Sequence, residues 1–131
     1  MLTLSQPEHL DPRFPEDALG AALGRLVHPG LMTTDPRTFR PTLALARAVR
    51  HPTPARVMEI DPSARFHDEI TVTADDVVVA TCRSVLDPRS TSRLRATYAR
   101  TFASVDAVGP RTVAFTLRAP TVRPVAPRPR E

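Results

Sequence analysis

The densest group of ionisable side chains in this sequence lies between residues 67 and 76. His67, Asp68 and Glu69 are consecutive, and Asp75 and Asp76 follow them closely. Imidazole and carboxylate groups can bind a metal ion or transfer protons. A metal site needs ligands that converge on one point, however, and this spacing matches no recognised motif such as H-E-x-x-H. The alternative is a polar turn before a capped helix, which the sequence favours, so we predict no metal site and no catalytic residue here.

Two other kinds of reactive site are also disfavoured. Cys82 is the only cysteine and could suggest a thiol nucleophile, but it lies on the apolar face of a predicted helix, as a buried small hydrophobic residue would. The four glycines, which are Gly20, Gly24, Gly30 and Gly109, fit neither G-x-x-x-x-G-K nor G-x-G-x-x-G, so no phosphate-binding loop is predicted. The residues alone therefore indicate no catalytic site.

The basic charge is concentrated near the C-terminus and does not predict nucleic-acid binding. The 131-residue chain has a formal net charge of +4, and residues 118–131 contain four arginines and one acidic residue. These residues include no aromatic side chain on which a base could stack. We expect residues 121–131 to form a disordered, Pro/Arg-rich tail. The whole chain has 41% hydrophobic residues, which is enough for residues 1–120 to form one small domain.

Three segments show helical patterns. Residues 16–28 have apolar side chains at three- and four-residue steps, which predicts an amphipathic helix. Residues 74–86 follow a threonine and an aspartate, Thr73 and Asp76, whose spacing is that of a capping box. Residues 92–100 predict a further short helix.

The strand signals are shorter. Residues 2–4 and 57–60 could each form a strand, and residues 43–49 have no clear type. Residues 102–108 and 111–118 are separated by Gly109 and Pro110, and apolar and small polar residues alternate in the second run. This alternation predicts an antiparallel hairpin with one buried face. The expected fold class is α+β, with mixed or antiparallel strands and two or three helices.

A motif in the middle of the chain resembles a known family. Residues 65–77, RFHDEITVTADDV, resemble the K-F-H-D-G-x-P-L-T-A-E-D-V signature of the family 5 extracellular solute-binding proteins. These are the peptide-, nickel- and oligosaccharide-binding receptors of bacterial ABC importers. Other pieces occur in the family's order, namely Leu10-Asp11-Pro12, Gly30-Leu31 with Asp35, Pro41-Thr42-Leu43-Ala44, and residues 111–120. The resemblance covers residues 2–120 and implies an N-terminal fragment of a two-lobed periplasmic-binding-protein-like fold.

The sequence departs from the family pattern at several positions. Glu69 replaces the signature glycine, which costs roughly 1 kcal/mol if the turn needs a positive φ. Arg47 stands where the family usually has a tryptophan, and Thr71 replaces a proline. The segment of residues 50–56 is shorter than the hairpin that usually precedes the central strand in this family. The family pattern ends after Pro120.

The resemblance implies a function in solute transport, in a protein that is not an enzyme and uses no cofactor. The chain would be the substrate-binding component of a bacterial ABC importer, or a truncated fragment of one, that captures peptides or similar small solutes for permease subunits in the membrane. The segment before Leu10 tends to face the interlobe cleft in this family, which makes Gln6, Pro7 and Glu8 candidate ligand contacts. Tyr98 is a further candidate, although a lone aromatic residue in a short helix is also typical of a core.

The family's usual location is the periplasm or the outer cell surface, but no signal peptide is visible in this chain. Two alternatives stay open. One is the sensor lobe of a cytoplasmic transcription regulator, and the other is a non-functional remnant of a receptor.

Overall fold

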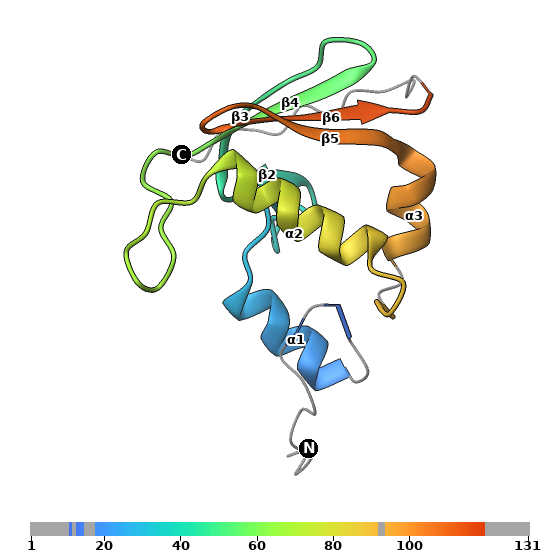
Figure 1. The fold of residues 1–131 in the computed structure, drawn as a ribbon. Coiled ribbons are helices and arrows are strands. Elements are labelled where there is room, and N and C mark those ends of the chain that lie inside the picture. The colour runs from blue at the N-terminus through green and yellow to red at the C-terminus, as the bar shows by residue number, and fades with distance from the viewer. Residues whose placement is uncertain (1–10, 12, 15–17, 92–93, 120–131) are drawn as a thin grey trace.

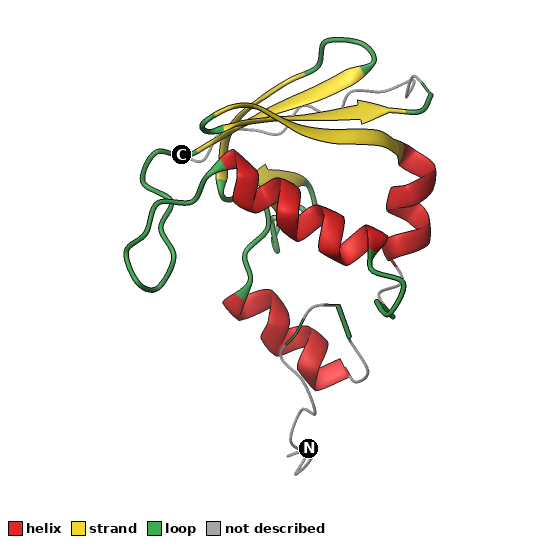
Figure 2. Ribbon diagram, viewed as in Figure 1, coloured by secondary structure: helices red, strands yellow, loops and turns green. Residues whose placement is uncertain are grey.

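The fold is α+β, as predicted, with helices packed on one face of an antiparallel sheet (Figures 1 and 2). The computed structural model describes residues 11, 13, 14, 18–91 and 94–119. The predicted strand at residues 2–4 and the predicted tail at residues 121–131 lie outside these ranges. The described elements are α1 (Ala18–Val27), β1 (Met32–Thr34), β2 (Pro41–Leu43), β3 (Ala46–Arg50), β4 (Ala55–Ile60), α2 (Ala74–Leu86), α3 (Leu94–Thr101), β5 (Phe102–Gly109) and β6 (Thr112–Leu117).

The main sheet has four strands in the order β3-β4-β6-β5, and all of its pairs are antiparallel. In β6, Val113, Phe115 and Leu117 are buried, while the residues between them are only half-buried. The predicted hairpin and its buried face are therefore confirmed. Both edge strands contain irregularities, because the pairing register shifts in β3 near Arg47 and at two places in β5.

Residues 43–49, for which the sequence indicated no type, are divided between two sheets. Leu43 ends β2, which pairs with β1 in a separate two-stranded sheet, and β3 begins at Ala46. Arg47 forms a salt bridge with Glu59 of the neighbouring strand β4. The residue that replaces the family's tryptophan therefore has a polar partner on the sheet surface.

Helix α2 begins and ends at the predicted bounds because its first turn is capped locally. The Thr73 Oγ1 atom accepts a hydrogen bond from the Asp76 backbone N–H at 3.3 Å, and the Asp76 carboxylate accepts one from the Thr73 N–H at 2.8 Å. This is the predicted capping box, which is confirmed. Figure 1 shows α2 running beneath the sheet, with α3 leading into the start of β5 and α1 farther from the sheet.

The core lies between the sheet and α2. Ile60 and Val113 are fully buried, and the other buried members of the cluster are Ala64, Val72, Ala74 and Phe115. The Ile60 N–H donates to the Arg111 carbonyl at 2.8 Å, which ties the end of β4 to the β5–β6 turn. The core therefore joins the residues on either side of segment 65–71, the start of α2 and the central strands.

The motif loop at residues 65–71 is closed by a bridge between Arg65 and Thr71. The Arg65 guanidinium also donates to the Thr71 Oγ1 atom at 2.8 Å, so the residue in place of the family's proline has its own hydrogen-bonding role. Glu69 lies in this loop with φ of 65°, in the left-handed region that favours glycine. The positive φ on which the expected cost depends is therefore present.

Replacing Glu69 by glycine is expected to raise the free energy of unfolding by about 0.5–1 kcal/mol. The left-handed conformation costs a residue with a β-carbon roughly 1–2 kcal/mol, and the greater chain entropy that glycine loses on folding offsets part of the gain. Urea unfolding monitored by circular dichroism measures the change. The Glu69→Ala variant is the control, because it removes the carboxylate and keeps the β-carbon. Equal stabilisation by both substitutions would show that the backbone conformation is not the cause.

A cluster of charges attaches Asp11 and Arg13 to the loop between α2 and α3. The Arg13 guanidinium contacts Asp11 at 2.6 Å and Asp87 at 3.3 Å, and the Arg13 carbonyl accepts a hydrogen bond from the Thr91 N–H at 3.0 Å. Arg89 also donates to Asp87. The side chain of Asp87 is only 11% exposed, so its charge is compensated by the arginines around it.

This cluster predicts a pH-dependent contribution to stability. The Arg13 side chain lowers the pKa of Asp11, and hydrogen bonds from Arg89 lower the pKa of Asp87. A carboxylate with a lowered folded-state pKa stabilises the fold above its unfolded pKa of about 3.9, and this contribution disappears as the pH falls through the folded value. We expect the Asp87→Asn variant to unfold at a lower temperature than the unmodified chain at neutral pH, and the difference to shrink in acid. A difference that does not change with pH would contradict this assignment.

Candidate functional site

The predicted ligand contacts fall in two groups. Gln6, Pro7 and Glu8 lie outside the residues that the structure describes. Tyr98 lies on α3 and is half-buried, with its ring centroid 5.3 Å from that of Phe102 and the ring planes inclined by 50°. The structure therefore places Tyr98 partly in the core and partly on the surface, where it lines a pocket.

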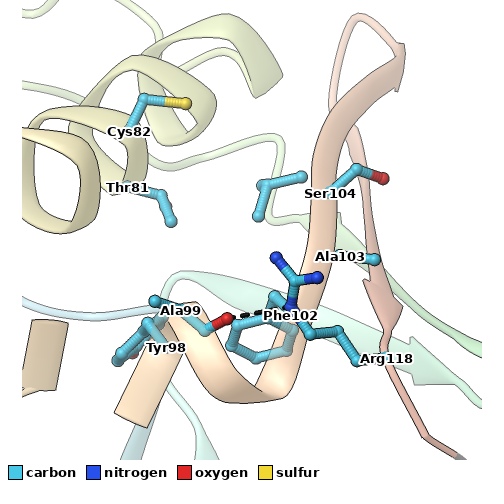
Figure 3. Close-up of a pocket in the computed structure, with 9 residues that line it drawn as sticks. Thr81, Cys82, Tyr98, Ala99, Phe102, Ala103, Ser104 and Arg118 are labelled. Atoms are coloured by element: carbon cyan, nitrogen blue, oxygen red, sulfur yellow. Dashed lines mark hydrogen bonds between the residues drawn. The ribbon is translucent and has the colours of Figure 1, made fainter. Parts of the chain in front are cut away.

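The pocket lies between α2, α3 and β5, and its volume is about 150 Å³ (Figure 3). Most of its lining is aliphatic or aromatic. The lining residues are Thr81 and Cys82 from α2, Tyr98 and Ala99 from α3, Phe102, Ala103, Ser104 and Val105 from β5, and Arg118 after β6. Three elements that follow one another in sequence thus line one small, half-open pocket whose described lining is largely apolar.

A row of aromatic rings supports one wall of this pocket. Tyr98 packs on Phe102, and the ring centroid of Phe102 is 5.4 Å from that of Phe115 at an angle of 54°. Both separations are within the range in which tilted aromatic pairs attract each other. Because Phe115 is buried in the central strand β6, the row connects the pocket wall to the core.

Arg118 supplies the charge of the pocket. Its Nε–H donates to the Ala99 carbonyl at 2.9 Å, and its backbone N–H donates to the Thr101 carbonyl at 3.0 Å. These two bonds hold the side chain against the end of α3, and Figure 3 shows the terminal guanidinium nitrogens pointing toward the α2 side. The nine lining residues that the structure describes include no Asp or Glu, so the net charge of the lining is positive.

Cys82 differs from its expected position. The sequence predicted a buried residue, whereas the structure shows a half-buried side chain that lines the pocket. Val77 and Val78, nearer the start of α2, pack on the core, and Cys82 lies one turn further along, where α2 passes over the gap between α3 and β5. The described lining contains no histidine or carboxylate that could take a proton from the thiol.

The acidic cluster has the structural role that the sequence favoured. Asp76 caps α2, and one Asp68 carboxylate oxygen accepts a hydrogen bond from the Ile70 N–H at 3.3 Å. His67 is exposed in the motif loop. Within the described ranges, no group of three or more His, Cys, Asp or Glu side chains could hold a metal ion. The described helices also include none that is both long and apolar enough to cross a membrane.

Comparison with known proteins assigns the fold to a class. No family model matches the chain, and no curated protein matches it. Solved structures do match. The periplasmic binding protein MoaA of A. tumefaciens R10, in complex with mannopinic acid, has a TM-score of 0.76 and 24% identity over 86% of this chain and 24% of its own.

Two further matches have the same character. The ABC transporter substrate-binding protein CtaP of Listeria monocytogenes has a TM-score of 0.70 and 27% identity over 89% of this chain and 24% of its own. The oligopeptide-binding protein AppA of Bacillus subtilis, solved with a nonapeptide, has a TM-score of 0.73 and 24% identity over 88% of this chain and 23% of its own. The chain thus spans about a quarter of the length of these proteins.

The chain has the fold of part of a periplasmic solute-binding protein. More particularly, its structural neighbours are family 5 solute- and oligopeptide-binding proteins, and the coverage is consistent with an N-terminal fragment. The expected resemblance of the chain to these proteins is thereby confirmed at the level of the fold. The neighbours are substrate-binding proteins rather than enzymes.

Proposed function

We propose that this chain is the substrate-binding component, or part of one, of a bacterial ABC importer. The observation that carries the proposal is the match of 86–90% of the chain, at TM-scores of 0.70–0.77, to solved substrate-binding proteins. Binding-protein chemistry also fits the described residues, because the pocket offers apolar surface and a charge without a base or a metal centre.

The ligand class follows from the neighbours and is part of the proposal. AppA was solved with a nonapeptide and MoaA with mannopinic acid, so peptides and small organic acids are both bound by proteins of this fold. We favour peptides or similar small solutes, captured non-covalently outside the cytoplasm and passed to permease subunits in the membrane. Gln6, Pro7 and Glu8 are the proposed ligand contacts of this function, together with Tyr98.

The small size of the matched region affects how this function operates. Since the chain spans about a quarter of its neighbours, a complete two-lobed enclosure of a peptide would need more polypeptide than these 131 residues. The contribution proposed for this chain is therefore one wall of the enclosure.

Solute uptake by the source bacterium tests the proposal. Deleting the gene is expected to reduce uptake of at least one labelled short peptide, and a plasmid copy is expected to restore it. A plasmid copy with Gln6 and Glu8 both replaced by alanine tests the proposed ligand contacts. At the same protein level, it is expected to restore less uptake than the unmodified plasmid copy. Uptake of peptides and organic acids that is unchanged by the deletion would overturn the proposed function.

A further inference from the structure

The pocket between α2, α3 and β5 has the dimensions of a site for a single small molecule. An apolar cavity of about 150 Å³ is large enough to hold a benzene ring. This volume is that of one aromatic ring and not of a peptide chain. The lining residues named above belong to the part of the chain that the structure describes, and the ligand of the pocket need not be the solute of the proposed function.

The lining combines an aromatic wall with one positive charge. Tyr98 and Phe102 provide ring surfaces that can pack against a planar apolar ligand. Arg118 provides a guanidinium at the same pocket, and its Nε–H bond to the Ala99 carbonyl holds that group in place. A guanidinium held in this way is suited to a carboxylate, which can accept two parallel N–H bonds.

From these features we propose that the pocket binds a small aromatic carboxylate. The ring lies against Phe102 and Tyr98, and the carboxylate accepts hydrogen bonds from Arg118. A cationic ligand is disfavoured, because the described lining contains no carboxylate to balance it. A neutral aromatic ligand would fill the same space without using the guanidinium, so it binds more weakly.

Ligand binding in the pocket can be measured in the whole chain through the alkylation of Cys82. It is the only cysteine and it lines the pocket, so the mass added by iodoacetamide reports the accessibility of this one position. Benzoate is the probe, and benzyl alcohol is its neutral counterpart of similar shape. Saturating benzoate is expected to slow alkylation of Cys82 several-fold, and benzyl alcohol is expected to need about tenfold or higher concentration for the same protection.

Two variants separate the charge from the shape of the pocket. Arg118→Gln retains a side-chain N–H donor and removes the charge, so benzoate is expected to bind about tenfold more weakly while benzyl alcohol is unaffected. Arg100→Gln is the matched control, because Arg100 is an exposed arginine at the end of α3 that is not among the lining residues. Ala99→Leu fills the space and is expected to abolish protection by both compounds.

The possible results are distinct. Weaker benzoate binding in Arg118→Gln, with Arg100→Gln unchanged, supports the proposal. Equal protection by benzoate and benzyl alcohol, or protection that survives in Ala99→Leu, overturns it. If Arg118→Gln does not fold, as judged by circular dichroism, the Ala99→Leu result and the comparison of the two compounds still decide. None of these measurements depends on solute uptake, so the proposal can fail while the proposed function holds.

Discussion

Replacing Phe115 by alanine is expected to lower the free energy of unfolding by about 3–5 kcal/mol. The side chain is 6% exposed in the central strand β6, and its ring packs on Phe102. Truncation would leave a cavity beneath the aromatic row as well as removing buried apolar surface. The chain contains no tryptophan, so urea unfolding should be monitored by circular dichroism.

Phe39 provides the matched control for this measurement. It is 81% exposed in the loop between β1 and β2, where its N–H donates to the Asp35 carbonyl at 2.8 Å. The Phe39→Ala variant keeps this bond and is expected to change the free energy of unfolding by no more than about 0.5 kcal/mol. Similar losses in the two variants would mean that the core is not organised around β6 as described.

Replacing Ile60 by alanine is expected to lower the free energy of unfolding by about 2–5 kcal/mol. Ile60 is fully buried at the end of β4, in contact with the cluster that includes Val113 and Ala74. This loss is a large fraction of the total free energy of unfolding of a small domain, which is only about 5–15 kcal/mol. Thermal unfolding of the variant should therefore begin at a markedly lower temperature.

Ile70 is the only other isoleucine in the chain and is 61% exposed in the motif loop. The Ile70→Ala variant makes the same chemical change at the surface, where the expected loss is no more than about 0.5 kcal/mol. If Ile70→Ala proved the more damaging substitution, the motif loop and not the end of β4 would contain the critical packing.

Features determined by neighbouring residues could be predicted from the sequence. The capping box between Thr73 and Asp76 sets the start of α2, and the alternation from Val113 to Leu117 identifies β6 and its buried face. Both signals need only a few consecutive residues. Residues 65–77, which carried the resemblance in the sequence, also lie in one continuous stretch, and the structural neighbours belong to the expected family.

Features that depend on distant residues could not be predicted in this way. The division of residues 43–49 between β2 and β3 depends on pairing with β1 and β4. The pocket brings together Cys82, Tyr98 and Arg118 from separate elements. In the sequence, Cys82 indicated only a buried residue and Arg118 indicated only basic charge. The residues around each position do not show that the two side chains lie near each other in the fold.

The irregular edge strands bear on how the protein behaves at high concentration. An exposed sheet edge offers unpaired backbone groups to another chain, and this is a common route to aggregation. Here the register shifts fall on β3 and β5, the two edges of the main sheet, and β3 also carries the exposed arginines Arg47 and Arg50. Bulges and charges on an edge oppose the addition of a further strand. The irregular edge strands, and the arginines on β3, therefore oppose the growth of fibrils by strand addition.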